Sequence, residues 1–261
     1  MTKSQIEVKA AMDSVKTALK VLEQVGIAGQ AGVSDLARAV GEPKSTIQRD
    51  LVTLHEAGWI RPVDVLGRRR WTLSSKVLAL ARRFQPALRL REHALPVMEE
   101  LRALTRETIH LMLREGNRVV LIERLDSPQT LRTVRQLGAS TPLHAASNGK
   151  AVLAWLSGPE RRAYLARPLQ AFTPRTLTDP AVLERDLETI RSKGYSLGDG
   201  ELDLDVRAVA AAIRLETGEP VAALSISCPA FRFPDEKIGE YGEWVRQAAE
   251  RIGAALMEEM A

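Results

Sequence analysis

Residues 41–60 read GEPKSTIQRDLVTLHEAGWI, and this stretch constrains the fold more than any other. Ile47, Leu51 and Leu54 recur at helical spacing, so one face of a helix belongs in a core. The opposite face begins with side chains that donate to phosphates and base edges, at the helix end where the dipole favours an anion: Lys44, Ser45, Thr46, Gln48 and Arg49. The stretch is therefore either a solvated surface or an edge that reads DNA.

Two shorter helices are expected before this stretch. The first covers Ser14 to Gly26, with an apolar stripe and a glycine stop. The stripe consists of Val15, Leu19, Leu22 and Val25. The second has Ser34 as its N-cap, Leu36 and Val40 facing inward, and Gly41 at its end. With Pro43 and Gly58 bounding the third helix, the three helices predict a helix-turn-helix.

A short hairpin is expected after the third helix. The segments WIRPV and RRRWTL read as strands on either side of a turn at Asp64 to Gly67. Arg68, Arg69 and Arg70 follow that turn, and alone they would favour a solvated charge run. Directly after a DNA-reading helix, they instead predict a wing that contacts the DNA backbone or the minor groove.

Individual roles on the third helix follow from its direction. Ser45, Thr46, Gln48 and Arg49 lie in the first two turns, the part of a recognition helix that reaches base edges. Gln suits adenine and Arg suits guanine, whereas Lys44 is better placed to hold a phosphate.

Charge and composition support a basic DNA-binding module followed by a different domain. Residues 1–85 carry 14 Lys and Arg against 8 Asp and Glu, whereas residues 86–261 carry 23 against 25. No apolar run approaches the roughly 18 residues that span a bilayer, and the charged N-terminus lacks a signal peptide's apolar centre. We therefore expect a cytoplasmic protein without membrane contact. The single cysteine, Cys228 in LSISCPA, reads as a buried, inert thiol.

The remaining chain predicts an α+β domain joined to the first by a helix. Residues 74–85 have an apolar stripe of helical period and are followed by Pro86, so the linker is expected to be a helix that ends there and packs on a partner chain. A second helical stretch is expected after it, at residues 90–108. Apolar strands flank the turns REGN and TGE, helical patterns lie between them, and a last amphipathic helix runs from about Pro234 to Met260. The expected organisation is a DNA-binding domain at 1–73, a linker helix at 74–90 and a second domain at 91–261.

These segments resemble one known family. PKSTIQRDLVTLHEAGWI followed by GRRRWTLSSKVLAL is similar to the winged helix-turn-helix of IclR-type bacterial transcriptional regulators. PLHAASNGKAVLAWL, GYSLGDGELDLDVRAVAAAI and PVAALSISCP look like signature segments of that family's effector-binding domain. The resemblance covers roughly residues 10–260 in the right order. It implies a homodimer or a tetramer of dimers, whose GAF-like or profilin-like C-terminal domain binds a small organic molecule.

The resemblance also implies an effector pocket. Carried over by motif position, its lining comprises Ser147, Asn148, Gly149, Val206, Ala208, Ser225 and Ser227. A helix N-terminus at SNGK offers free N–H groups to a carboxylate, and alternate serines on a strand face one side.

Three positions depart from the family's usual pattern. Family members commonly have cysteine at Ala208, glycine at Asp205 and an acidic residue at Gly198. We therefore expect Asp199 or Glu201 to accept from a donor on the ligand, which fits an amide, hydroxyl or amine better than a simple acid. The alternative is that both belong to an exposed acidic loop.

Other classes of protein remain as alternatives. An enzyme would need a catalytic group, and of the four scattered histidines only His144 precedes the ligand loop. Glu201, Asp203 and Asp205 alternate as hard-metal ligands would, but without further oxygen ligands nearby. We expect neither a metal nor a cofactor. A DNA-binding structural protein without a sensor is the third class.

The sequence thus predicts a ligand-responsive transcription factor rather than an enzyme. Its partners would be double-stranded operator DNA, a small organic effector and further copies of the chain. We expect a repressor of a neighbouring catabolic operon that senses an aromatic acid, an amide or a hydrazide-like compound.

Overall fold

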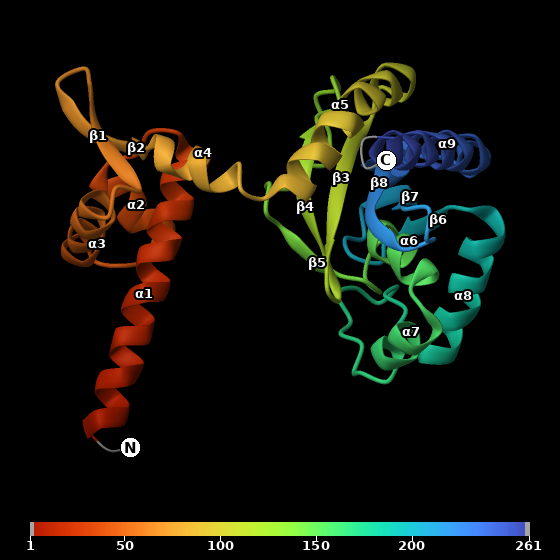
Figure 1. The fold of residues 1–261 in the computed structure, drawn as a ribbon, viewed down its shortest axis with the longest axis horizontal. Helices are drawn as coiled ribbons and strands as arrows, with labels where there is room; N and C mark the ends of the chain where they lie inside the picture. The colour runs from red at the N-terminus through yellow and green to blue at the C-terminus, as the bar shows by residue number, and fades with distance from the viewer. Residues whose placement is uncertain (1–2, 259–261) are drawn as a thin grey trace. The chain divides into compact units, whose positions relative to one another are not determined.

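The chain forms two compact units in a computed structural model, residues 1–85 and residues 86–261 (Figure 1). The structure describes the backbone of residues 3–258 and the side chains of residues 13–258. Each unit has its own hydrophobic core, so each is described by itself.

Unit 1 is a helix-turn-helix followed by a hairpin. Its elements are α1 (Lys3–Ala28), α2 (Val33–Val40), α3 (Lys44–Glu56), β1 (Ile60–Val65), β2 (Arg68–Leu73) and α4 (Ser75–Ala81). α1 and α2 pack on α3 around a core that includes Val21, Val25, Ile47, Leu51 and Trp71. Trp71 also joins the hairpin to the turn after α1, because its N–H donates to the carbonyl of Ala31 at 2.8 Å.

Two details of the first helices differ from the sequence prediction. α1 begins at Lys3, before the predicted start at Ser14, and continues through Gly26 to Ala28. Among its described side chains Val21 and Val25 are buried, whereas Val15 and Leu19 are exposed. The N-cap of α2 is Gly32 rather than Ser34, which lies within the first turn. Gly41 ends α2 in the left-handed conformation, as expected.

The hairpin turn is tighter than predicted. Val65 pairs with Arg68, which leaves only Leu66 and Gly67 as turn residues. Both have positive φ, 52° for Leu66 and 72° for Gly67, as a two-residue hairpin turn that matches the strand twist requires.

The break between the linker helix and the next helix lies earlier than predicted. α4 starts after the N-cap Ser74 and ends at Ala81, and α5 (Gln85–Thr105) begins after a break at residues 82–84. Pro86 fits the first turn of α5, where a backbone N–H is not needed, and so it starts a helix instead of closing one. Leu90 packs into the core of unit 2, which begins at Pro86.

Unit 2 is built on a six-stranded antiparallel sheet. After α5 come β3 (Thr108–Glu115), β4 (Arg118–Leu125), β5 (Ser140–Pro142), α6 (Ser147–Trp155), α7 (Gly158–Leu165), α8 (Pro180–Lys193), β6 (Ser196–Asp199), β7 (Val206–Arg214), β8 (Pro220–Pro229), a 3-10 turn (Ala230–Arg232) and α9 (Glu236–Glu258). The strand order is β5-β4-β3-β8-β7-β6, so the two predicted hairpins meet at the centre through β3 and β8.

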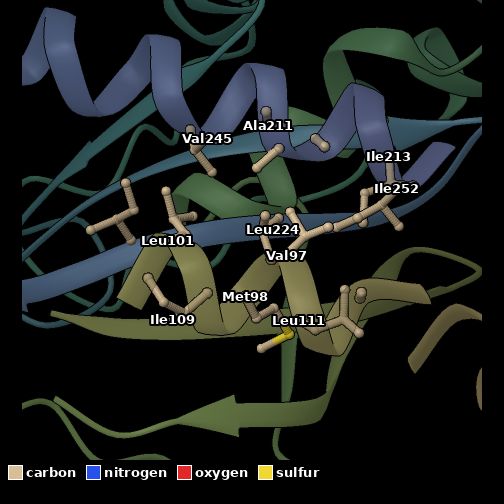
Figure 2. Packing of buried hydrophobic residues seen from close by; sticks show 14 of the residues in the cluster. Val97, Met98, Leu101, Ile109, Leu111, Ala211, Ile213, Leu224, Val245 and Ile252 are labelled. Carbon is tan, nitrogen blue, oxygen red and sulfur yellow. The ribbon is translucent and has the colours of Figure 1, made fainter. Parts of the chain in front are cut away.

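Helices cover both faces of this sheet. Ile109, Leu111, Leu224 and their neighbours on one face pack against α5 and α9, as Figure 2 shows. The other face packs against α6, α7 and α8 through a second core that includes Met112. Strand residues alternate between the two faces. His110, Ser225 and Ser227 therefore belong to the α6 side.

Candidate DNA-reading edge and effector cavity

The exposed edge of α3 has the composition predicted for it. Ile47, Asp50, Leu51 and Leu54 are buried and fix the helix in unit 1. The other predicted DNA-reading residues of the first two turns face outward: Lys44, Ser45, Gln48 and Arg49 are exposed and Thr46 is half-buried. The helix N-terminus is unobstructed by a side-chain cap, so its N–H groups and dipole are available to a phosphate.

The three wing arginines have different environments. Arg68 is exposed beside the turn. Arg69 is exposed as well, but its guanidinium lies 4.9 Å from the centroid of the Trp71 ring. Arg70 is half-buried and donates to the carbonyl of Gln30 at 3.3 Å and to Asp35 at 3.5 Å. The structure therefore places Arg70 in a contact with the rest of unit 1.

Unit 2 contains a cavity of about 920 Å³ on the α6 side of the sheet. It is lined by strand residues of β3, β7 and β8, the start of α6, the β4–β5 segment, and the β6–β7 loop. Seven residues that the sequence placed in an effector pocket lie along it: Ser147, Asn148, Glu201, Val206, Ala208, Ser225 and Ser227. Residues as far apart in sequence as Ser147 and Ser227 thus line the same cavity.

The floor of the cavity follows from strand register. His110 of β3 pairs with Ser225 of β8, and Ser227 pairs with Ala208 of β7. Because these residues alternate with the apolar core positions, their side chains share the cavity side of the sheet. Asn148 of α6 lies over this row and donates through Nδ2 to Ser225 Oγ at 3.0 Å.

The start of α6 borders the cavity at close quarters. Ala146, the N-cap, has no side-chain acceptor, so the first N–H groups of the helix stay available. Gly198 lines the cavity beside them, and a Cβ there would stand 3.1 Å from the Ser147 nitrogen. Gly149 does not line the cavity. It allows close packing instead, since a Cβ on it would stand 2.4 Å from the carbonyl oxygen of Leu143.

A buried ion cluster lies behind this helix end. The Lys150 ammonium is 2.6 Å from Glu201 Oε1 and 2.9 Å from Asp186 Oδ2, and Lys150 is only 1% exposed. Burial raises the pKa of the Glu201 carboxyl, against the lowering effect of Lys150. The sequence did not suggest a role for Lys150. In this structure it positions Glu201, whose second oxygen is left without a hydrogen-bond partner among the described residues.

Asp199 lies outside the lining of the cavity, unlike Glu201. Its carboxylate pairs with Arg207 at 3.1 Å and with Arg175 at 3.3 Å. These ion pairs hold it on the β6–β7 hairpin. Of the two acids expected to accept from a ligand, only Glu201 lines the cavity, and it is buried rather than exposed.

The histidine singled out in the sequence is not the one at the cavity. His144 is buried, with Nδ1 2.8 Å from Tyr164 Oη and Nε2 2.9 Å from the carbonyl of Gln170, and it does not line the hollow. His110 does line it, and burial lowers its pKa to about 3, with smaller contributions from Arg135 and Arg124. His110 is therefore neutral at ordinary pH.

Sequence reasoning also missed the β4–β5 segment, which supplies a large part of the wall. Thr133 and Arg135 line the cavity from it, and Thr133 Oγ1 lies 3.3 Å from Ser227 Oγ. Phe172 and Phe231 contribute from other connecting segments. The only available signal was a pair of arginines, Arg132 and Arg135, in a domain that is otherwise slightly acidic.

The remaining sequence expectations concern a thiol, metals and membranes. Cys228 is buried, as expected, and burial raises the pKa of its thiol to about 12. Within the described residues, no three acid, histidine or cysteine side chains cluster as metal ligands would. Glu201, Asp203 and Asp205 lie in a loop rather than along one strand face. None of the described helices is long and apolar enough to cross a membrane.

The fold and its two surfaces define a class of protein, and family comparison identifies it. Residues 14–64 match the IclR helix-turn-helix domain, and residues 86–254 match the C-terminal domain of the bacterial transcriptional regulator IclR. The chain therefore belongs to the IclR family of bacterial DNA-binding transcriptional regulators. It is a regulator and not an enzyme.

Individual relatives agree over nearly the whole chain. The acetate operon repressor of Salmonella typhimurium is 33% identical over 248 residues, which cover 94% of this chain and 90% of the repressor. The crystal structure of Thermotoga maritima IclR superimposes with a TM-score of 0.77 at 30% identity, covering 94% of this chain and 99% of that one. An IclR homologue from Microbacterium hydrocarbonoxydans complexed with 4-hydroxybenzoate gives a TM-score of 0.74 at 30% identity, with the same coverage.

Proposed function

We propose that this chain is a repressor that leaves its operator, or binds it less tightly, when a small organic molecule fills the cavity of unit 2. The observation that carries this proposal is the cavity itself, about 920 Å³ and lined by both apolar and polar side chains. A DNA-binding protein without a sensor would not need it. The names of the relatives supply the repressor role by analogy.

In this proposal the exposed edge of α3 reads the operator. Gln48 and Arg49 are the base readers, with Ser45 and Thr46 beside them, and Lys44 holds a phosphate. Arg68 and Arg69 act as backbone contacts on the wing, while Arg70 supports the wing from within unit 1. Operator binding by unit 1 and effector binding by unit 2 are both proposed to take place in the cytoplasm.

A dimer is part of the same proposal. Reading two half-sites needs two copies of α3 at a fixed spacing. Unit 1 also exposes large apolar side chains that a partner chain could cover, namely Val15, Leu19, Ile27, Leu78, Leu80 and Phe84. The division at residues 1–73, 74–90 and 91–261 stays a prediction beside the two compact units, which meet at residues 85 and 86.

The effector is proposed to be an aromatic acid, an amide or a hydrazide-like compound. Phe172 and Phe231 offer apolar walls, and the serines, Asn148 and the first N–H groups of α6 offer polar contacts. The complex of a family member with 4-hydroxybenzoate supports a molecule of this size.

Fluorescence anisotropy tests the regulator directly. The purified chain is titrated onto the intergenic DNA upstream of its own gene and onto a scrambled duplex, at two salt concentrations. Tighter binding to the native fragment that persists at the higher salt is expected, because base contacts do not depend on counterion release. Equal, salt-sensitive binding to both duplexes would leave only a basic surface and would refute the proposal.

A further inference from the structure

The tip of the β1–β2 hairpin carries an exposed leucine. Leu66 follows the last residue of β1, and it is 97% exposed. The next most exposed large apolar residue among the described side chains is Phe231, at 75%. The hairpin tip projects from the helices of unit 1, as Figure 1 shows. Leu66 therefore adds nothing to a core, and its side chain is presented to whatever the hairpin contacts.

The backbone of Leu66 has a conformation that leucine disfavours. Its φ of 52° lies in the left-handed region, where the Cβ of an L-residue crowds the following carbonyl oxygen. Asparagine, aspartate or glycine normally occupies this position of a two-residue hairpin turn, because these residues tolerate positive φ. The turn forms all the same, since the N–H of Gly67 donates to Asp64 Oδ1 at 2.9 Å.

The stability of unit 1 does not explain this combination. A single exposed leucine is ordinary on a protein surface. A leucine that is both exposed and strained stabilises nothing in the hairpin, and an asparagine would fit the turn better. Backbone strain of this kind is concentrated at functional sites. The combination therefore points to a contact outside the chain.

The charges around Leu66 indicate what it contacts. Arg68 and Arg69 come directly after the turn, and both are exposed. Asp64, the only acid of the hairpin, lies opposite Arg69 in the strand register, which offsets its charge. An apolar tip beside cations suits a groove that has phosphates along its edges and sugars and base edges on its floor. The hairpin follows the recognition helix, so this groove is the minor groove of the bound DNA.

We propose that Leu66 enters the minor groove of operator DNA as an apolar wedge, which partly separates two stacked base pairs and bends the duplex. The inference rests on the proposed function, since it concerns how the wing contacts the operator. Arg68 and Arg69 hold phosphates beside the wedge. A pyrimidine–purine step is the least costly to open, so the wedge adds a sequence preference without a hydrogen bond to a base.

Leu66→Asn separates a contact with DNA from a structural role. Asparagine tolerates positive φ, so the melting temperature of the variant should equal or exceed that of the parent. Operator affinity should nevertheless fall by about tenfold, because the burial of one leucine side chain against DNA is lost. Leu66→Met should keep most of the affinity, since methionine is apolar and of similar reach. Parent affinity in Leu66→Asn, measured by fluorescence anisotropy, overturns the proposal.

Salt dependence distinguishes the wedge from a phosphate contact. Leu66→Asn should leave the slope of log affinity against log salt unchanged, because an apolar contact releases no counterions, whereas Arg69→Ala should lower it. A lowered slope in Leu66→Asn would mean that the whole wing has left the DNA, which contradicts the wedge. Light scattering measures the oligomeric state of the free proteins. A loss of self-association in Leu66→Asn would assign Leu66 to a contact between copies of the chain and would also refute the proposal.

Two optical measurements on bound DNA detect the wedge itself. The part of the intergenic fragment that the parent protects from cleavage is made with 2-aminopurine at successive positions and, separately, with donor and acceptor dyes at its ends. At saturating parent protein, 2-aminopurine fluorescence should rise at one step in each half-site because unstacking relieves quenching. Energy transfer should increase because bending brings the ends together. Saturating Leu66→Asn should produce neither change, and equal signals from the two proteins rule out the wedge.

The proposed function and this inference can fail separately. The preference of the parent for the native fragment over a scrambled duplex tests operator binding without regard to Leu66. The comparison of parent with Leu66→Asn tests the wedge on either duplex, and a smaller loss of affinity is expected on the scrambled one. A loss in Leu66→Asn without operator preference in the parent refutes the operator and keeps the wedge. Operator preference that Leu66→Asn retains at parent affinity refutes the wedge alone.

Discussion

At the scale of single residues, the buried His110 should make the free energy of unfolding depend on pH. Its pKa in the folded protein is lowered to about 3, from an ordinary value of 6.5, mainly by burial. As pH falls from 6.5 toward 3, the unfolded chain therefore takes up a proton that the folded chain refuses. The free energy of unfolding then decreases by up to about 1.4 kcal/mol per pH unit from this group.

Substituting His110 isolates this contribution. In His110→Gln, the loss of stability between pH 7.5 and pH 5 should be smaller than in the parent, because the substituted side chain binds no proton in either state. Urea unfolding at both pH values measures the difference. Parallel losses in parent and variant would show that His110 titrates in the folded protein as it does in the unfolded chain.

Arg49 is the residue on which sequence choice should depend most. It is exposed on α3 beside Gln48, while its neighbour Asp50 is buried. Arg49→Ala is expected to cost roughly 1–3 kcal/mol of binding on the cognate operator and less on a scrambled duplex. Arg69→Ala is the control, because a backbone contact should weaken both duplexes alike and lower the salt dependence. Anisotropy titrations decide the matter, and an unchanged operator affinity in Arg49→Ala would exclude it as a base reader.

At the scale of elements, the close approach of α6 to the preceding loop holds the cavity in shape. A Cβ on Gly149 would lie 2.4 Å from the Leu143 carbonyl oxygen and 2.7 Å from the Leu143 Cα. These are backbone atoms, so the start of α6 would have to move. Gly149→Ala should therefore destabilise unit 2 by about 1–3 kcal/mol and weaken effector binding.

Gly239 of α9 provides the matched control for Gly149. A Cβ there meets nothing within 4 Å. Because Ala is the better helix former, Gly239→Ala should stabilise unit 2 by about 0.5–1 kcal/mol. Thermal unfolding of the two variants gives the comparison. A Gly149→Ala variant as stable as Gly239→Ala would mean that the loop before α6 yields without cost.

The same elements show what the sequence could and could not predict. α2, α3 and the hairpins β3–β4 and β7–β8 combine strong periodicity with glycine stops or turns, and they were predicted close to where they lie. β5 and β6 were missed because three or four residues hold too little of a period to recognise. The break between α4 and α5 was expected at Pro86 and lies at residues 82–84, because Pro86 can either follow a helix or start one.

The site residues, too, could be predicted where they lie on periodic elements and not where they lie on connecting segments. Motif positions on strands and on α6 placed Ser147, Asn148, Ser225 and Ser227 along the cavity. Connecting segments carry no period, so Arg135 and Phe172 could not be placed. Asp199 and Glu201 are two residues apart in sequence, and only three-dimensional pairing with Arg207 and Lys150 separates their environments.

At the scale of the whole molecule, the division into two units at residues 85 and 86 predicts that the sensor folds alone. The core of unit 2 draws on α5 from Leu90 onward, and Leu90 is only 2% exposed. A fragment of residues 86–261 keeps this helix complete, including its first turn at Pro86. It should unfold cooperatively and bind the effector as the full chain does, without affinity for operator DNA.

A fragment that starts at residue 91 is the informative comparison, because it removes Leu90 and the first turn of α5 and nothing else from unit 2. Loss of one buried leucine costs about 2–5 kcal/mol, so residues 91–261 should melt at a clearly lower temperature than residues 86–261. Differential scanning calorimetry of both fragments measures this. Equal melting temperatures would mean that the first turn of α5 contributes nothing to the stability of the sensor and acts only as a linker. The effect of effector binding would then have to pass to the DNA-binding unit through residues outside the core of the sensor.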